Sequence, residues 1–210
     1  MVVTKSADIL RVFHGRANNV DRAFVCKHVL FFSASFLLIS SVVLAKPVIT
    51  TRYEYYDIKG STKQELRDQL RKVGPHRGGE TVAYTEHNGS FNYQTGGTGA
   101  CGVVSYQVTM AIVYHMPRWQ QATNSSSPLA QEWNKFVQAL QIHEDGHAQN
   151  ARDTAQAMDK AIADVPAFSD CRRTKSAVVA AAQKAISQCD RLDTDYDQKT
   201  MHGIKQGATL

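Results

Sequence analysis

The sequence has no internal repeat, no cluster of basic residues and no apolar run long enough to cross a bilayer as an ordinary helix. The absence of a repeat excludes a repeat array, and the absence of a basic patch excludes a typical nucleic-acid-binding surface. Its 43% content of hydrophobic residues excludes a disordered chain. The 210 residues are therefore suited to a single globular domain, for which we expect no nucleic-acid partner.

The longest apolar run, residues 29–43, is uncharged, follows Lys27 and is too short to be an ordinary transmembrane helix. Val43 and Ala45 are small residues at the two positions that a signal peptidase reads. The pattern predicts a signal peptide over residues 1–45, although an uncleaved membrane anchor is the alternative. The mature domain, residues 46–210, would then be periplasmic or secreted, with no stable membrane anchor. It carries 19 basic and 17 acidic residues, so part of the pI of 9.0 belongs to the leader.

Cysteines are few, and the mature part keeps three of them: Cys101, Cys171 and Cys189. If residues 171–192 form one helix, Cys171 and Cys189 lie about 27 Å apart along it. A disulfide requires Cα atoms within about 7 Å, which excludes that pair. Cys189 also falls on the apolar stripe of the same helix, as a buried free thiol does. We therefore predict a disulfide between Cys101 and Cys171, with Cys101–Cys189 as the alternative.

The most informative stretch is His143-Glu144-Asp145-Gly146-His147, an H-E-x-x-H motif within the longest helix-forming segment. Two histidines four residues apart lie on one face of a helix and can bind a single metal ion, usually Zn²⁺. Glu144 lies about 100° round the helix from His143, where it can take a proton from the water that the ion activates. The motif predicts Zn²⁺ bound by His143 and His147, with Glu144 as the general base.

A surface helix can match this motif by chance, so the flanking residues matter. An apolar stripe at helical spacing precedes the motif and continues through both histidines, which places them on the inward face: Leu129, Trp133, Phe136 and Leu140. A buried neutral imidazole needs a hydrogen-bond partner or a metal. The stripe therefore favours a metal site over a chance match.

The remaining patterns predict an α+β fold, with a small antiparallel or mixed sheet, one early helix and two long later helices. β-branched and aromatic residues predict a strand over 48–58, and a capping box at Thr62 opens a helix that Gly74-Pro75 ends. Asn88-Gly89 predicts a hairpin turn, and alternation over 104–116 predicts a strand with one buried face that Pro117 ends. The two long helices are expected from about 129 to 165 and from about 171 to 196.

Several short pieces spread along the mature chain match one family: Tyr55 to Ser61, Cys101, Pro117-Arg118-Trp119, Trp133, His143 to His147, and Tyr196-Asp197 with Thr200 and His202-Gly203. On these residues the chain resembles a bacterial family of predicted secreted zinc-dependent proteases, usually labelled as a domain of unknown function. The resemblance implies a zincin-like fold and peptidase activity.

A catalytic zinc site takes three protein ligands, so a third must accompany the two histidines. Asp153 would lie about 15 Å from His143 along an unbroken helix, which is out of reach. No glutamate lies between Cys171 and His202. Aspartates lie near the end of that helix, but we expect Leu192 and Tyr196 to occupy its buried face there, so that no acidic residue lies on it. Gly203 lets the chain turn back after His202. We therefore predict His202 as the third ligand. Tyr196 is expected either to donate a hydrogen bond to the oxyanion or to pack as the last core residue of its helix.

Together these patterns predict a zinc metallopeptidase with a peptide or protein substrate, which could add to an exposed sheet edge beside the motif helix. Two alternatives stay open. One is a non-peptidase zinc hydrolase that uses the same water chemistry on another bond. The other is a binding or structural module whose metal merely staples the helices, against which the general base Glu144 argues.

Overall fold

The computed structural model describes residues 46–75, 81–120 and 126–210, so the predicted signal peptide lies outside the described residues. The elements follow in the order β1 (Val48–Ile58), α1 (Lys63–Val73), β2 (Tyr84–Gly96), β3 (Gly102–Trp119), α2 (Pro128–Ala163), α3 (Cys171–Thr200) and a 3₁₀ turn η2 (Ile204–Gln206). This is the α+β arrangement that the sequence predicts. Within the described ranges, no helix combines the length and the apolar character that crossing a membrane requires.

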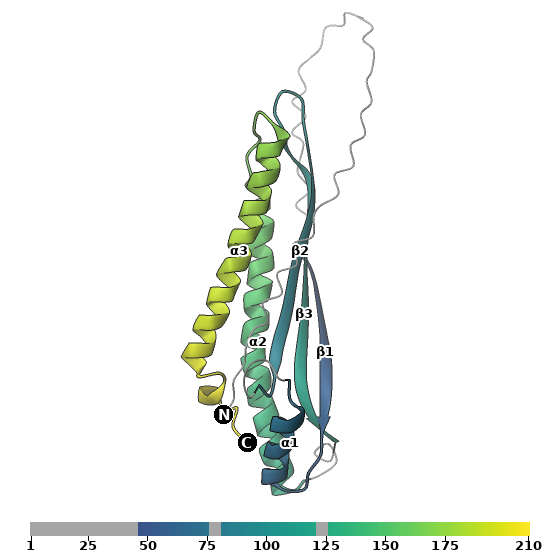
Figure 1. Ribbon diagram of the computed structural model, residues 1–210, viewed down its shortest axis with the longest axis vertical. Helices are drawn as coiled ribbons and strands as arrows, with labels where there is room; N and C mark the ends of the chain where they lie inside the picture. The colour runs from purple at the N-terminus through teal and green to yellow at the C-terminus, as the bar shows by residue number, and fades with distance from the viewer. Residues whose placement is uncertain (1–45, 76–80, 121–125) are drawn as a thin grey trace, which may run out of the picture.

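The three strands form a mixed sheet in the order β1-β3-β2, in which β1 is parallel to β3 and β2 is antiparallel to it (Figure 1). The central strand β3 buries every second residue from Tyr106 to Met116, as the alternation predicts. Val104, near the start of β3, is instead 61% exposed. The buried face of this sheet supports the helix that carries the H-E-x-x-H motif.

The predicted hairpin turn at Asn88-Gly89 is wrong. Both residues lie inside β2, opposite Ala111 and Met110 of β3, and the chain turns only after Gly96. A Cβ atom on Gly89 would lie 3.1 Å from the terminal methyl group of Met110. Gly89 therefore makes room for a core side chain, and its role is packing instead of turning.

Two boundaries lie further along the chain than predicted. Strand β3 continues through Pro117 to Trp119. These last residues pair with β1 alone, because the pairing between β2 and β3 reaches only to Tyr84 opposite His115. Proline is tolerated where only one neighbouring strand is paired. Helix α3 continues past Tyr196 to Thr200 and ends in the left-handed residue Met201.

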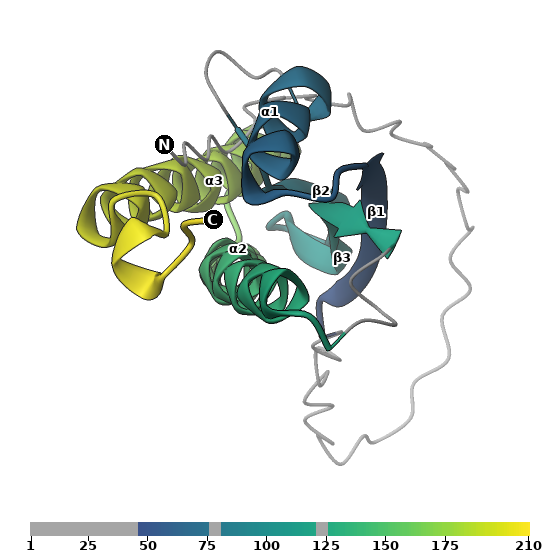
Figure 2. The ribbon, with the colours of Figure 1, turned by 90° about the horizontal axis from the view of Figure 1, so that it is seen from below.

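The helices pack on one face of the sheet. Helix α2, 36 residues long, lies against β2 and β3, and α3 lies along α2 and reaches β2 (Figures 1 and 2). Ser127 caps α2, and Pro128 occupies its first turn, where a missing N–H costs nothing. The predicted capping box at Thr62 is present, with reciprocal bonds to Glu65. The core is thus closed between one sheet face and two long helices.

A disulfide joins Cys101, just before β3, to Cys171 at the start of α3, and Cys189 is a buried free thiol. Both predictions about the cysteines are confirmed. Cys101 also exchanges backbone hydrogen bonds with Phe168, at 2.7 and 2.9 Å. The start of α3 is therefore tied to the sheet covalently and by main-chain bonds, which fixes its position along α2.

Candidate metal centre

The three residues of the motif lie on the buried face of α2. His143 and Glu144 are 0% exposed and His147 is 2% exposed, and the aromatic residues before them, Trp133 and Phe136, are also buried. The inward orientation that the apolar stripe predicts is therefore confirmed. Burial of two imidazoles and a carboxylate demands polar partners for each of them.

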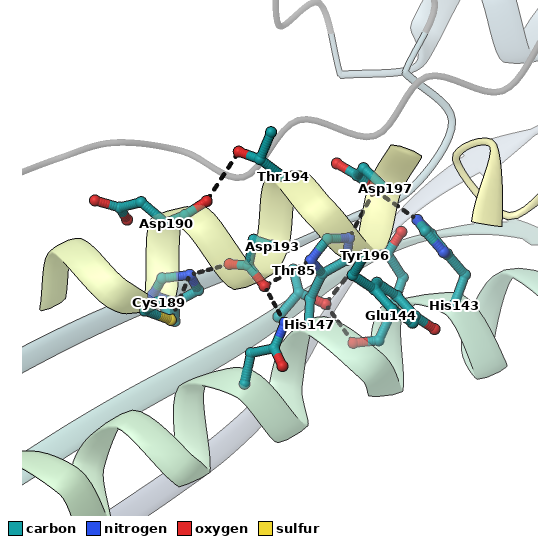
Figure 3. A network of polar contacts seen from close by, with 12 residues as sticks. Thr85, His143, Glu144, His147, Cys189, Asp190, Asp193, Thr194, Tyr196 and Asp197 are labelled. Carbon is teal, nitrogen blue, oxygen red and sulfur yellow. Dashed lines mark hydrogen bonds and ion pairs between the residues drawn. The ribbon is translucent and has the colours of Figure 1, made fainter. Parts of the chain in front are cut away.

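A single carboxylate oxygen lies between the two histidines. Oδ1 of Asp197, on α3, is 3.1 Å from Nε2 of His143 and 3.0 Å from Nε2 of His147 (Figure 3). One donor atom from each of the three residues lies within 4.8 Å of the other two, and all three residues are buried. In Figure 3 the aspartate points from α3 toward the histidines of α2.

This donor set fits a divalent transition metal. Two imidazole nitrogens and one carboxylate oxygen are the ligands of a common type of catalytic zinc site. Tetrahedral coordination with bonds of about 2.0–2.2 Å places donor atoms about 3.4 Å apart. The observed separations of 3.0 and 3.1 Å therefore need to widen by only a few tenths of an ångström to hold the ion.

Each histidine is oriented by a partner at its other ring nitrogen. Nδ1 of His143 lies 3.0 Å from Oε1 of Gln206, and Nδ1 of His147 lies 2.9 Å from Oδ1 of Asp193. Because both partner oxygens accept hydrogen bonds, a neutral imidazole keeps its proton on Nδ1. Nε2 is then left as a metal ligand, which is the usual arrangement around metal-binding histidines.

Glu144 is held at one oxygen only. The hydroxyl of Thr85, on β2, lies 3.0 Å from Oε2 of Glu144 (Figure 3). Oε1 is buried and has no hydrogen-bond partner among the residues that the structure describes. Burial raises the pKa of Glu144, and the two nearby histidines oppose that change. A buried carboxylate oxygen without a partner is costly, and a water molecule held by a metal would satisfy it.

The carboxylates of α3 place a negative charge around His147. Burial lowers the pKa of His147, but hydrogen bonds to Asp193 and Asp197 outweigh that effect and raise it to about 10. Burial raises the pKa of Asp193, but hydrogen bonds from His147 and His87 keep it well below the usual range. A site with this charge balance favours a cation, either protons or a metal ion.

Tyr196, on α3, packs against both histidines of the pair. Its ring stacks on His143 at a centroid distance of 5.2 Å and meets His147 edge-on at 5.2 Å. A Cβ atom on Gly146 would overlap this ring, so glycine inside the motif lets the tyrosine lie over the helix. The Tyr196 hydroxyl accepts a hydrogen bond of 3.0 Å from Gln206.

The structure places the two residues considered as third ligand differently. Asp153 is exposed on the unbroken helix α2 and accepts a hydrogen bond from Gln149, in agreement with its exclusion. Nδ1 of His202 lies 3.5 Å from Oδ1 of Asp197, and its side chain is 36% exposed. His202 is thus near the centre but outside the group of three convergent donors, and its role as a ligand stays a prediction.

Asp197 is the residue that the sequence reading missed, and the reason lies in the buried face of α3. Leu192 was expected on that face but is 40% exposed, whereas Asp193 and Asp197 are 1% and 7% exposed. The expectation that no acidic residue occupies the buried face is therefore wrong. The two aspartates follow the buried Cys189 at steps of four residues, which is the signal that identifies them.

Comparison with known proteins identifies the family but not an activity. Residues 53–203 match the model of a family described as bacterial protein of unknown function (DUF922), and the chain belongs to this family. No match was found among curated proteins or among solved structures. The matched range includes all residues of the candidate metal centre described above except Gln206.

Proposed function

We propose that this DUF922 protein is a zinc-dependent metallopeptidase whose metal ligands are His143, His147 and Asp197. The observation that carries the proposal is the convergence of their three donor atoms within 4.8 Å of one another. The carboxylate of Glu144, with one oxygen unpartnered among the described residues, follows His143 directly on α2. Two histidines and a third ligand, with an adjacent carboxylate as the general base, are the groups that a hydrolytic zinc site requires.

The protein's own groups have distinct tasks in this proposal. A bound Zn²⁺ supplies Lewis acidity, which lowers the pKa of a water molecule and polarises a carbonyl group. Glu144 takes a proton at Oε1 and passes it to the leaving amine, while Thr85 holds Oε2. Burial raises the pKa of Glu144, which makes this carboxylate a stronger base. Burial also raises the pKa of Tyr196, which keeps its hydroxyl protonated as a donor to the developing oxyanion.

Access for a peptide requires movement of the C-terminal segment, Met201–Leu210. Gly203, in a left-handed conformation with φ of 81°, packs so closely that a Cβ atom there would lie 3.2 Å from Cγ of His143. Gln206 bridges His143 and Tyr196. Displacement of this segment would open the centre next to β2, an edge strand of the sheet to which an extended peptide can add.

The disulfide between Cys101 and Cys171 supports an oxidising compartment, and we propose the periplasm or the exterior of the cell. A structural disulfide that anchors α3 to the sheet is uncommon in proteins of the reducing cytosol. Mass mapping of the protein recovered from periplasm and from medium, without reduction, tests the location. Recovery in the cytosol with free thiols would contradict it.

The test of the proposed function combines metal analysis with proteolysis of an unstructured protein substrate by residues 46–210. Glu144→Gln should retain the metal but lower the rate of hydrolysis by at least about 100-fold, because only the base is removed. The matched control is Glu132→Gln on the same helix, where the side chain is 53% exposed and paired with Lys63. Loss of zinc in the Glu144→Gln protein, or unchanged hydrolysis, would contradict the assignment.

Complete burial of the centre favours a second candidate function, a structural metal site. The three proposed ligands are all less than 10% exposed, as in a site that only staples two helices together. Glu144 argues against it, because a structural site needs no base and a buried carboxylate is costly. A panel of peptide, ester and amide substrates separates the candidates. A structural site gives no turnover on any substrate, and a non-peptidase hydrolase cleaves only bonds other than peptides.

A further inference from the structure

A second group of metal-ligand side chains lies beside the first centre. Its members are His87 from β2 and Cys189 and Asp193 from α3, and one donor atom from each lies within 4.8 Å of the others. Cys189 and Asp193 are four residues apart, so they lie one turn apart on the same face of α3. His87 lies near the start of β2, two residues after Thr85.

The distances within this group suit a tetrahedral ion. Nε2 of His87 is 2.9 Å from Oδ2 of Asp193 and 4.0 Å from Sγ of Cys189. Bonds of about 2.0–2.3 Å to nitrogen, oxygen and sulfur place donors about 3.3–3.6 Å apart. The imidazole therefore has to shift by about half an ångström between the two α3 side chains.

The group is protected from solvent and holds three different kinds of donor. Cys189 and Asp193 are each 1% exposed, and the His87 side chain is 12% exposed. A thiolate is a soft ligand and an imidazole a borderline one, a combination that selects zinc-like cations over magnesium or calcium.

We propose that His87, Cys189 and Asp193 bind a second divalent cation of the zinc type. The proposal is independent of peptidase activity, because it needs only these three side chains. The group also touches the first centre, since the other oxygen of Asp193 accepts hydrogen bonds from His147 and from Asn150, at 2.9 and 2.8 Å. The same carboxylate thus ligates the second cation and orients a ligand of the first.

A hydrogen-bonded cluster without a cation is the competing interpretation. In that case Asp193 accepts from His87, His147 and Asn150, and the three contacts merely orient His147. The two interpretations differ in metal stoichiometry and in whether sulfur is bound to metal. Neither property depends on catalysis, so both can be measured without a substrate.

Cobalt substitution of residues 46–210 provides the test, because a Co²⁺–thiolate bond gives a charge-transfer absorption band in the near ultraviolet. Cys101 and Cys171 are joined in a disulfide, so Cys189 is the one thiol of the described residues that can produce this band. We expect two Co²⁺ ions per chain and a thiolate band in the parent protein. We expect the band to persist in His143→Ala, and to be lost with one of the ions in Cys189→Ser.

Each outcome decides the proposal. One ion per chain without a thiolate band in the parent protein overturns it and supports the hydrogen-bonded cluster, even if Cys189→Ser fails to fold. A thiolate band in a protein that hydrolyses no substrate supports the second site while the proposed peptidase function fails. Hydrolysis by a protein that binds a single ion and shows no thiolate band supports the peptidase function and overturns the second site.

Discussion

Asp197→Asn tests the assignment of the third metal ligand most directly. The substitution preserves the size of the side chain but removes the negative charge of the carboxylate that lies 3.0 and 3.1 Å from the two Nε2 atoms. Loss of a contact that only orients a ligand weakens metal binding by about 10–100-fold. In the proposed site Asp197 contributes a donor atom itself, so we expect zinc affinity to fall by more than about 100-fold. That factor corresponds to about 2.7 kcal/mol, at 1.36 kcal/mol per tenfold change.

Zinc affinity is measured by competition with a chromogenic chelator, with residues 46–210 at constant pH and ionic strength. The matched control is Asp195→Asn, which makes the same change at an exposed position on the same helix and should leave affinity unchanged. Asp153→Ala should likewise have no effect, because Asp153 faces solvent on α2. Thermal unfolding of each metal-free variant separates loss of a ligand from loss of the fold.

His202→Ala separates the structural assignment from the prediction made on sequence alone. Nδ1 of His202 lies 3.5 Å from Asp197, so this side chain can orient a ligand. Removing an orienting contact weakens metal binding by about 10–100-fold, and we expect His202→Ala to weaken zinc binding by no more than that. A larger effect for His202→Ala than for Asp197→Asn would refute the reasoning. So would an Asp197→Asn protein that binds zinc within tenfold of the parent.

The other predictions concern stability. Gly146→Ala gains about 1 kcal/mol of helix propensity but overlaps the Tyr196 ring, at a cost of about 1–3 kcal/mol, so chemical denaturation should show a net loss. A variant about 1 kcal/mol more stable than the parent would contradict this, and Tyr196→Ala should restore the gain. In the metal-free protein, the free energy of unfolding should be highest between about pH 4 and 6.5 and should fall from 6.5 toward 10. The pKa of His147 is raised to about 10, so its contribution is complete below its unfolded value of about 6.5 and is lost as the pH rises. The pKa of Asp193 is lowered, so its contribution is present above its unfolded value of about 3.9 and is lost as the pH falls. A free energy of unfolding that increases between pH 6.5 and 10 would contradict this prediction. Asp193→Asn should make the free energy of unfolding depend less on pH.

Features that depend on short-range patterns are predictable from the sequence. The long helix that carries the motif, its inward face and the capping box at Thr62 all follow from spacing within a few turns of chain. The disulfide partner of Cys101 follows from the length of a single helix, which separates Cys171 from Cys189. Each of these inferences uses geometry internal to one element.

The predictions that are wrong concern positions where one element packs against another. Asn88-Gly89 is a strong hairpin signal by itself, yet β2 passes straight through it because Gly89 faces the side chain of Met110. Leu192 was expected to be buried as an apolar residue, but the packing of α3 on α2 turns Asp193 inward instead. In both cases the packing of one element against another outweighs the local preference of the residues.

The placement of the two histidines and of the glutamate between them follows from the local sequence alone, because an α-helix fixes the positions of residues one turn apart. The side chain that lies between the two histidines depends instead on how α3 packs against α2. Asp197 lies fifty residues from His147, on a different helix, and its burial is favourable only because two imidazoles are there to meet its charge. The polar partners of a buried aspartate come from another part of the chain, and hydrophobic periodicity carries no information about them.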